Sequence, residues 1–158
     1  MGEDTYNEIQ RIDSLWPLLI FTLAAAGNWL IYFYFGYSDF NLFYVSMLSA
    51  LLLSVFLFSL RLYTRIDISG VQYRFFPFHF AWRKLAWREI TSYHIREYNP
   101  WAEFGGWGLR YGKSGWACTI SGKAGLQLVL VSKKKVLIGT VQPDKMKDFI
   151  NLKLTKTI

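Results

Sequence analysis

The sequence predicts a membrane helical hairpin followed by a mostly β-stranded domain that ends in one helix. Two observations lead to this prediction. Apart from Asp39, no residue between Leu15 and Leu60 is charged at neutral pH, and this stretch is too long for one buried core helix. Most of the chain's 18 Lys and Arg residues come after this stretch, where short runs of alternating apolar and polar residues are typical of strands. A chain of 158 residues suffices for one domain and a small appendage.

The N-terminal residues 1–14 are expected to form a tail or a short interfacial helix. Thr5 and Glu8 have the spacing of a capping box, and Ile9 and Ile12 would then share one helical face. A partly ordered tail is the alternative.

The apolar stretch divides at Gly-Tyr-Ser-Asp, residues 36–39, into two segments of membrane-crossing length. About 20 apolar residues span a hydrocarbon core of roughly 30 Å. We therefore expect a transmembrane hairpin over 15–62, with spans of about 15–36 and 40–62 joined by a tight turn. A cleaved signal peptide is disfavoured, because the first segment is too long for one and the flank before it is acidic.

The basic residues predict how the hairpin crosses the membrane. Arg61 and Arg65 follow the second span, whereas the turn contains no Lys or Arg. The positive-inside rule then puts both termini in the cytoplasm and the turn outside. We expect a multi-pass protein of the cytoplasmic membrane.

Small and polar residues in the two spans predict a face for helix packing or for a partner helix. Small residues spaced four apart let helices approach closely in lipid. Asn28 is expected at the depth of Ser49, and a buried amide needs a partner, so we expect a hydrogen bond from Asn28 to Ser49 or Ser46. The predicted face comprises Ala24, Asn28, Ser46, Ser49, Ala50 and Ser54.

Residues 63–158 are expected to form a cytoplasmic domain of about seven short strands. Alternation with period two, as in Ile66/Ile68 and Tyr93/Ile95, supports the strand assignment. The predicted strands cover 64–69, 71–78, 84–98 with a corner at 89–92, 107–112, 115–121, 126–132 and 135–140.

One helix is expected to close the domain. Gln-Pro-Asp at 142–144 suits a helix start, because proline fits the first turn and the Asp carboxylate lies at the positive end of the helix dipole. Met146, Phe149 and Ile150 would then lie on one apolar face that covers the strands.

Element order and several motifs resemble bacterial PH-like (pleckstrin-homology-like) domains. The run TRIDISGVQYRFFPF at 64–78 is similar to that family's opening hairpin, and KLAWREITSYHI at 84–95 to its next strand. The most specific motifs are G-x-x-G-L-Q-L at 122–128 and I-G-T-x-x-P-D at 138–144. The resemblance covers about 63–152 and includes the two preceding spans. It implies an antiparallel barrel or sandwich capped by one helix, in a bacterial inner-membrane protein.

The glycine-rich run GGWGLRYGKS at 105–114 does not have the pattern of a nucleotide-binding loop. A P-loop needs a glycine five residues before Gly112, and Trp107 stands there. The residues after Ser114 look like a strand, whereas the motif requires a helix that binds phosphate at its N-terminus.

No other pattern predicts catalytic chemistry. Cys118 is the only cysteine, and His79 and His94 lack metal-ligand spacing. We expect no enzyme activity, no cofactor, no metal, no small-molecule substrate and no nucleic acid.

Basic residues beyond the second span predict contact with an anionic membrane surface. Residues 74–84 mix cations with aromatic side chains, and the neighbouring spans favour lipid over RNA as their partner. Lys133–Lys135 is expected to form an exposed turn. The candidate membrane-surface residues are Arg61, Arg65, Arg74, Arg83 and Lys84.

Three functions remain open. The first is a membrane-anchored interaction module that mediates protein–protein assembly at the cytoplasmic membrane face. The second is an accessory structural subunit of a larger membrane complex, and the third is a sensor of anionic lipid or of the membrane surface. The expected partners are the lipid bilayer and one or more membrane proteins.

Overall fold

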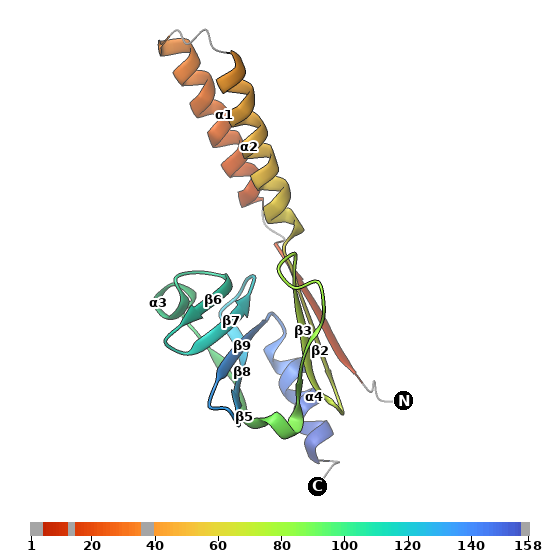
Figure 1. Cartoon of the computed structure of the whole chain (residues 1–158). Helices are drawn as coiled ribbons and strands as arrows, with labels where there is room; N and C mark the ends of the chain where they lie inside the picture. Colours follow the sequence, from red (N-terminus) through yellow and green to blue (C-terminus); the bar gives the residue numbers. More distant parts are fainter. Residues whose placement is uncertain (1–4, 13–14, 36–39, 156–158) are drawn as a thin grey trace. The chain divides into compact units, whose positions relative to one another are not determined.

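A computed structural model describes residues 5–12, 15–35 and 40–155 of the chain (Figure 1). The chain divides into two compact units. One unit joins Met1–Arg11 to Arg61–Ile158 and is called the β unit below. The other, Ile12–Leu60, contains two helices and is called the helix pair.

The helix pair consists of α1 (Trp16–Phe35) and α2 (Phe40–Ser59), which run in opposite directions. The Ser54 hydroxyl near the end of α2 donates to the Pro17 carbonyl at the start of α1, at 3.2 Å. Among the described residues, one helix meets the length and hydropathy expected of a membrane span, over Pro17–Tyr34, and Phe43–Ser59 is a shorter apolar helix. The predicted turn at 36–39 lies outside the described residues.

The second helix ends at Ser59, and the predicted end at residue 62 is wrong. Arg61 and Leu62 already belong to strand β2 (Arg61–Asp67). Leu62 is fully buried in the β unit, so its apolar side chain serves the core of that unit instead of extending the span.

The first sheet has the order β1-β2-β3-β4. It contains β1 (Tyr6–Arg11), β2, β3 (Gly70–Phe76) and β4 (Arg83–Ala86). The prediction of a helix or tail at the N-terminus is wrong for β1, which pairs with β2 along its whole length, from Tyr6↔Ile66 to Arg11↔Arg61. The β unit therefore begins before the helix pair, which is inserted between its first two strands.

The second sheet has the order β5-β8-β9-β7-β6. Its strands are β5 (Ile90–Glu97), β6 (Gly108–Gly112), β7 (Gly115–Thr119), β8 (Ala124–Leu130) and β9 (Lys135–Thr140). Neighbouring strands are antiparallel except for β7 and β9, which are parallel. The break between the strands of 84–98 begins two residues before the corner predicted at 89–92: a short 3-10 helix, η1 (Trp87–Glu89), separates β4 from β5, which already begins at Ile90.

The β unit is completed by two helices, α3 (Pro100–Phe104) and α4 (Pro143–Thr155). As predicted, α4 turns an apolar face to the core: Met146 and Ile150 are buried, and the Phe149 ring lies 5.9 Å from that of Tyr6 on β1. Both sheets and α4 contribute to this core. Its fully buried large side chains include Leu62, Ile66, Val71, Phe75, Leu126, Leu128, Leu137, Ile138, Met146 and Ile150.

Candidate functional site

Strand β1 is tied to the second sheet by a buried carboxylate. Glu8 is only 5% exposed and accepts four hydrogen bonds. The Thr140 hydroxyl donates at 2.7 Å, the Val141 backbone N–H at 2.8 Å and the Gln10 amide at 2.9 Å, and the Tyr6 hydroxyl is the fourth donor. Burial, with the adjacent Glu8 carboxylate, raises the pKa of Tyr6, so its hydroxyl keeps the proton that it donates.

Both chain connections to the helix pair leave from neighbouring positions of the first sheet. β1 ends at Arg11, β2 begins at Arg61, and these two residues face each other in the register. A carboxylate anchors β1, and the ladder joins β1 to β2, so the two connections are held side by side. Glu8 and Gln10 were not predicted as site residues, because hydrophobic alternation indicates strands with apolar residues turned inward, whereas polar residues face the interior here.

The predicted membrane-surface cations occupy two faces of the first sheet. Arg61 and Arg65 alternate with the buried Leu62, Thr64 and Ile66 and thus lie on the outer face of β2. Arg74 faces Tyr63 and shares this outer face, as does Lys84, which is paired with Gln72.

Arg83 belongs to the opposite face, because its register partner is the buried Tyr73. The structure therefore brings four of the five candidates together and separates the fifth.

The loop between β3 and β4, residues 77–82, presents aromatic side chains at the sheet end where Arg61 pairs with Phe76. Phe78, Phe80 and Trp82 are 54%, 81% and 44% exposed. We call this segment the aromatic loop. The mixture of cations and aromatic side chains at 74–84, which includes this loop, is visible in the sequence, whereas the position of the loop at the sheet end that carries Arg61 follows from strand pairing.

Only some residues of the predicted helix-packing face are buried between α1 and α2. Ala50 and Ser54 are buried there, Ala24, Asn28 and Ser46 are partly exposed, and Ser49 is exposed.

The predicted bond from Asn28 to Ser46 or Ser49 is not formed. The Ser46 hydroxyl donates to the Phe43 carbonyl and that of Ser49 to the Ser46 carbonyl, both within α2. Serine can donate its hydroxyl to a carbonyl on its own helix, so neither Ser46 nor Ser49 needs a partner across the helix pair.

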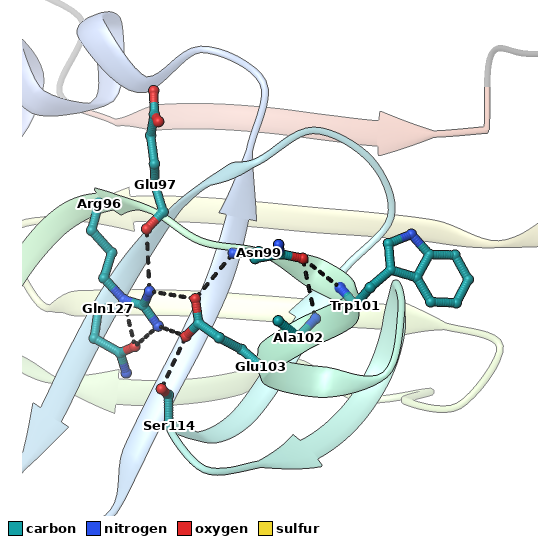
Figure 2. A network of polar contacts seen from close by, with 8 residues as sticks. All are labelled: Arg96, Glu97, Asn99, Trp101, Ala102, Glu103, Ser114 and Gln127. Carbon is teal, nitrogen blue, oxygen red and sulfur yellow. Dashed lines mark hydrogen bonds and ion pairs between the residues drawn. The ribbon is translucent and has the colours of Figure 1, made fainter.

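A polar network positions α3 beside the second sheet (Figure 2). Arg96 on β5 forms a two-pronged ion pair with Glu103, at 2.7 Å and 3.1 Å, and also contacts Gln127 on β8. The Ser114 hydroxyl donates to the same carboxylate at 3.0 Å. The hydrogen bonds from Arg96, with those from Asn99 and Ser114, lower the pKa of Glu103 to about 2.

Around α3, β6 and β7 the surface carries four exposed large aromatic side chains. The rings of Trp101 and Trp107 lie 5.8 Å apart, and those of Tyr111 and Trp116 lie 5.3 Å apart. We call these four residues the aromatic cluster. Asn99 caps α3 by accepting from two backbone N–H groups, and the Asn-Pro pair at 99–100 was the signal in the sequence that could have revealed this helix.

The glycine-rich run forms a hairpin. Gly112 and Gly115 face each other, and Lys113-Ser114 is the turn between β6 and β7. Gly112 is required for packing, since a Cβ atom there would come within 2.1 Å of the Glu103 carbonyl. The residues that mimic the end of a P-loop thus lead into a strand.

Side chains with reactive or metal-binding chemistry are dispersed. The Cys118 thiol is buried on β7, and burial raises its pKa to about 12. Within the described ranges, the structure shows no group of three or more His, Cys, Asp or Glu side chains that could hold a metal ion. Lys133 and Lys134 lie exposed in the turn between β8 and β9, as predicted, and Lys135, also exposed, is the first residue of β9.

Comparisons with protein-family models, with curated proteins and with solved structures found no match to this chain.

Proposed function

We propose that the chain is a non-enzymatic, two-pass membrane protein whose β unit mediates protein–protein assembly at the cytoplasmic face of the bacterial inner membrane. One observation supports this above all others. Residues 17–34 of α1 have a mean hydropathy of 1.4, yet only 6% of them are buried within the protein. A core helix of a soluble protein buries its apolar side chains, so this helix needs apolar surroundings from outside the chain.

Strand pairing supports a two-pass arrangement. β1 precedes α1, β2 follows α2, and the two strands pair directly, so the chain must leave and return on the same side of the membrane. The β unit contains most of the basic residues, which favours the cytoplasmic side.

The β unit supports assignment to the pleckstrin-homology-like class through the succession of strands from β2 to β9 followed by α4. Three features depart from the expected pattern: the additional strand β1, the inserted helix α3 and the parallel pairing of β7 with β9. β1 is an edge strand of the first sheet, whereas the parallel pair of β9 and β7 lies inside the second.

The aromatic cluster is the surface that we assign to the protein partner. Exposed Trp and Tyr are enriched where proteins bind one another, because large rigid rings bury much area at little entropic cost. Arg110 and Lys113 are exposed on the same hairpin, so the partner surface is expected to combine apolar and acidic groups.

The alternative of an accessory subunit differs in where the partner binds. In that case the partner would contact the exposed polar side of α2, where Ser49 lies. A photo-crosslinking amino acid placed at Trp101 or at Ser49 in cells separates the two. Crosslinks from position 101 support the module, and crosslinks from position 49 alone support the subunit.

Membrane topology tests the proposal itself. Ser38→Cys should react with an impermeant thiol reagent in intact cells, whereas Ile68→Cys, exposed on the β unit, should react only after permeabilisation. Wild-type protein is the background control, because its Cys118 is buried. Labelling of Ile68→Cys in intact cells would contradict the proposed orientation.

A further inference from the structure

We infer that the aromatic loop, residues 77–82, inserts into the interfacial zone of the bilayer that the helix pair crosses. This inference rests on the proposed function, since it requires the helix pair to span a membrane. The partner is a lipid surface, and the loop is a third contact with it in addition to the two helices.

Chain connectivity limits how far the loop can lie from the end of α2. α2 ends at Ser59 and β2 begins at Arg61, and two peptide steps reach at most about 8 Å. Arg61 faces Phe76, and facing residues of antiparallel strands have Cα atoms about 5 Å apart. Phe76, the residue before the loop, therefore lies within about 13 Å of the end of α2, at any angle between the two units.

The loop turns its aromatic side chains outward and is anchored by the histidine between them. His79 is buried, its backbone N–H donates to the Phe75 carbonyl at 2.7 Å, and its ring lies 6.1 Å from that of Tyr73. Phe78 and Phe80, on either side of it, are exposed. The buried residue thus fixes the loop to the sheet, and the exposed surfaces of Phe78, whose ring also lies 5.7 Å from that of Phe75, and of Phe80 face the surroundings.

Contacts with the end of the sheet support the outward side chains. The Phe80 ring lies 6.3 Å from Phe76, and the Trp82 ring lies 6.2 Å from Tyr63. The Arg74 guanidinium lies over the rings of Tyr63 and Trp82, 4.6 Å and 5.3 Å from their centroids. The loop is therefore preorganised and loses little conformational freedom when it enters lipid.

The composition of the loop and its neighbours matches the membrane interface. Aromatic rings concentrate at the level of the lipid headgroups, and basic side chains next to them attract anionic headgroups. Arg11 and Arg61 lie exposed at the same end of the sheet. A protein or RNA partner would place no constraint on which end of the sheet carries such a loop, whereas a bilayer requires the end next to α2.

Site-directed spin labelling of the full chain tests this inference. Single cysteines replace Phe80, Ile68 and Leu52, each labelled with a nitroxide in liposomes of phosphatidylcholine with a minority of phosphatidylglycerol. Ile68 is the matched control: it is an apolar residue, 79% exposed, just beyond the opposite end of β2. Seven strand residues at about 3.4 Å each separate the two ends by roughly 20 Å.

We expect the label at position 80 to be more accessible to oxygen than to a water-soluble nickel complex, and the label at position 68 to show the reverse. Leu52, exposed on α2, should report the bilayer interior. If the labels at positions 80 and 68 are equally accessible to the nickel complex while the label at position 52 reports the bilayer interior, the loop does not enter the interface. The inference is then wrong, but the helix pair still spans the membrane. If position 52 reports water, the proposed function fails and the inference with it. Melting temperatures equal to that of the wild type confirm that the labelled variants are folded.

Discussion

Removing the Glu8 carboxylate should release β1 and destabilise the β unit. In Glu8→Ala, two donors of fixed direction lose their acceptor: the Val141 backbone N–H and the Gln10 amide, both aimed at the same carboxylate oxygen. A buried donor left without a partner costs about 1 to 3 kcal/mol. Gln10 keeps a second bond to the Gly139 carbonyl, so we expect a total loss near 3 kcal/mol.

Glu8→Gln should be milder, for a reason specific to this geometry. The remaining carboxylate oxygen accepts from the Tyr6 and Thr140 hydroxyls. Hydroxyls also accept hydrogen bonds, so both can reverse and receive the new amide N–H groups, while the amide oxygen serves the two fixed donors. The charge assistance is lost, and the two hydroxyl protons lose the carboxylate as their acceptor, so we expect a cost of about 1 to 2 kcal/mol, below that of Glu8→Ala.

Urea unfolding of the full chain in mild detergent, followed by near-ultraviolet circular dichroism, measures both variants. Glu97→Ala and Glu97→Gln are the controls, because Glu97 is exposed on β5 and its substitution should change stability by less than about 0.5 kcal/mol. Equal effects of Glu8→Ala and Glu97→Ala would refute the role of the network. Equal effects of the two Glu8 variants would refute the reversal of the hydroxyls.

Three other features of the β unit give measurable expectations. A fragment that starts at Arg61 lacks β1 and should unfold at lower urea than one in which Tyr6–Arg11 is joined to Arg61 by a short Asn-Gly turn; equal midpoints would show that β1 is dispensable. The folded pKa of Glu103 is depressed from 4.5 to about 2, so its ion pair stabilises the fold fully above the unfolded pKa, and this part is lost as pH falls from about 4.5 towards 2. In Glu103→Gln the melting temperature should depend less on pH across that interval. A pH dependence equal to that of the wild type would contradict a stabilising role of the Arg96–Glu103 ion pair. Cys118 should not react with a thiol reagent at pH 8 until urea unfolds the protein; rapid reaction of the native state would show that β7 opens.

The strands of the β unit could be predicted where one face is apolar and the other polar. β2 follows this rule, with Leu62 and Ile66 turned to the core, and its predicted position overlaps the observed strand. β8 also lies near its predicted position, although Gln127, between the buried Leu126 and Leu128, is buried as well. Period-two burial is a local property of the chain, so it can be detected without knowing the partner strand.

Strand β1 could not be predicted by the same rule. Its inward residues are Tyr6, Glu8 and Gln10, and its outward residues include the 61% exposed Ile9, so the apolar pattern is partly reversed. What makes Glu8 suitable for the interior is a set of donors supplied by residues about 130 positions away in the chain. The burial of a polar group depends on such distant partners, which a single sequence does not show.

The position of Glu8 also bears on the charge pattern around the helix pair. The residues before α1 include one basic residue, Arg11, and four acidic ones, among them Glu8, and acidic residues contribute little to the positive-inside rule. The structure removes the Glu8 carboxylate into the core of the β unit, while Arg11 is exposed and faces Arg61 at the end of the sheet. The residues at the two connections to the helix pair are thus both arginines, and they lie next to the aromatic loop. Positive charge and aromatic rings thus gather at the end of the first sheet from which the chain enters the helix pair. This is the end where the proposed membrane insertion of the aromatic loop brings the protein against anionic headgroups.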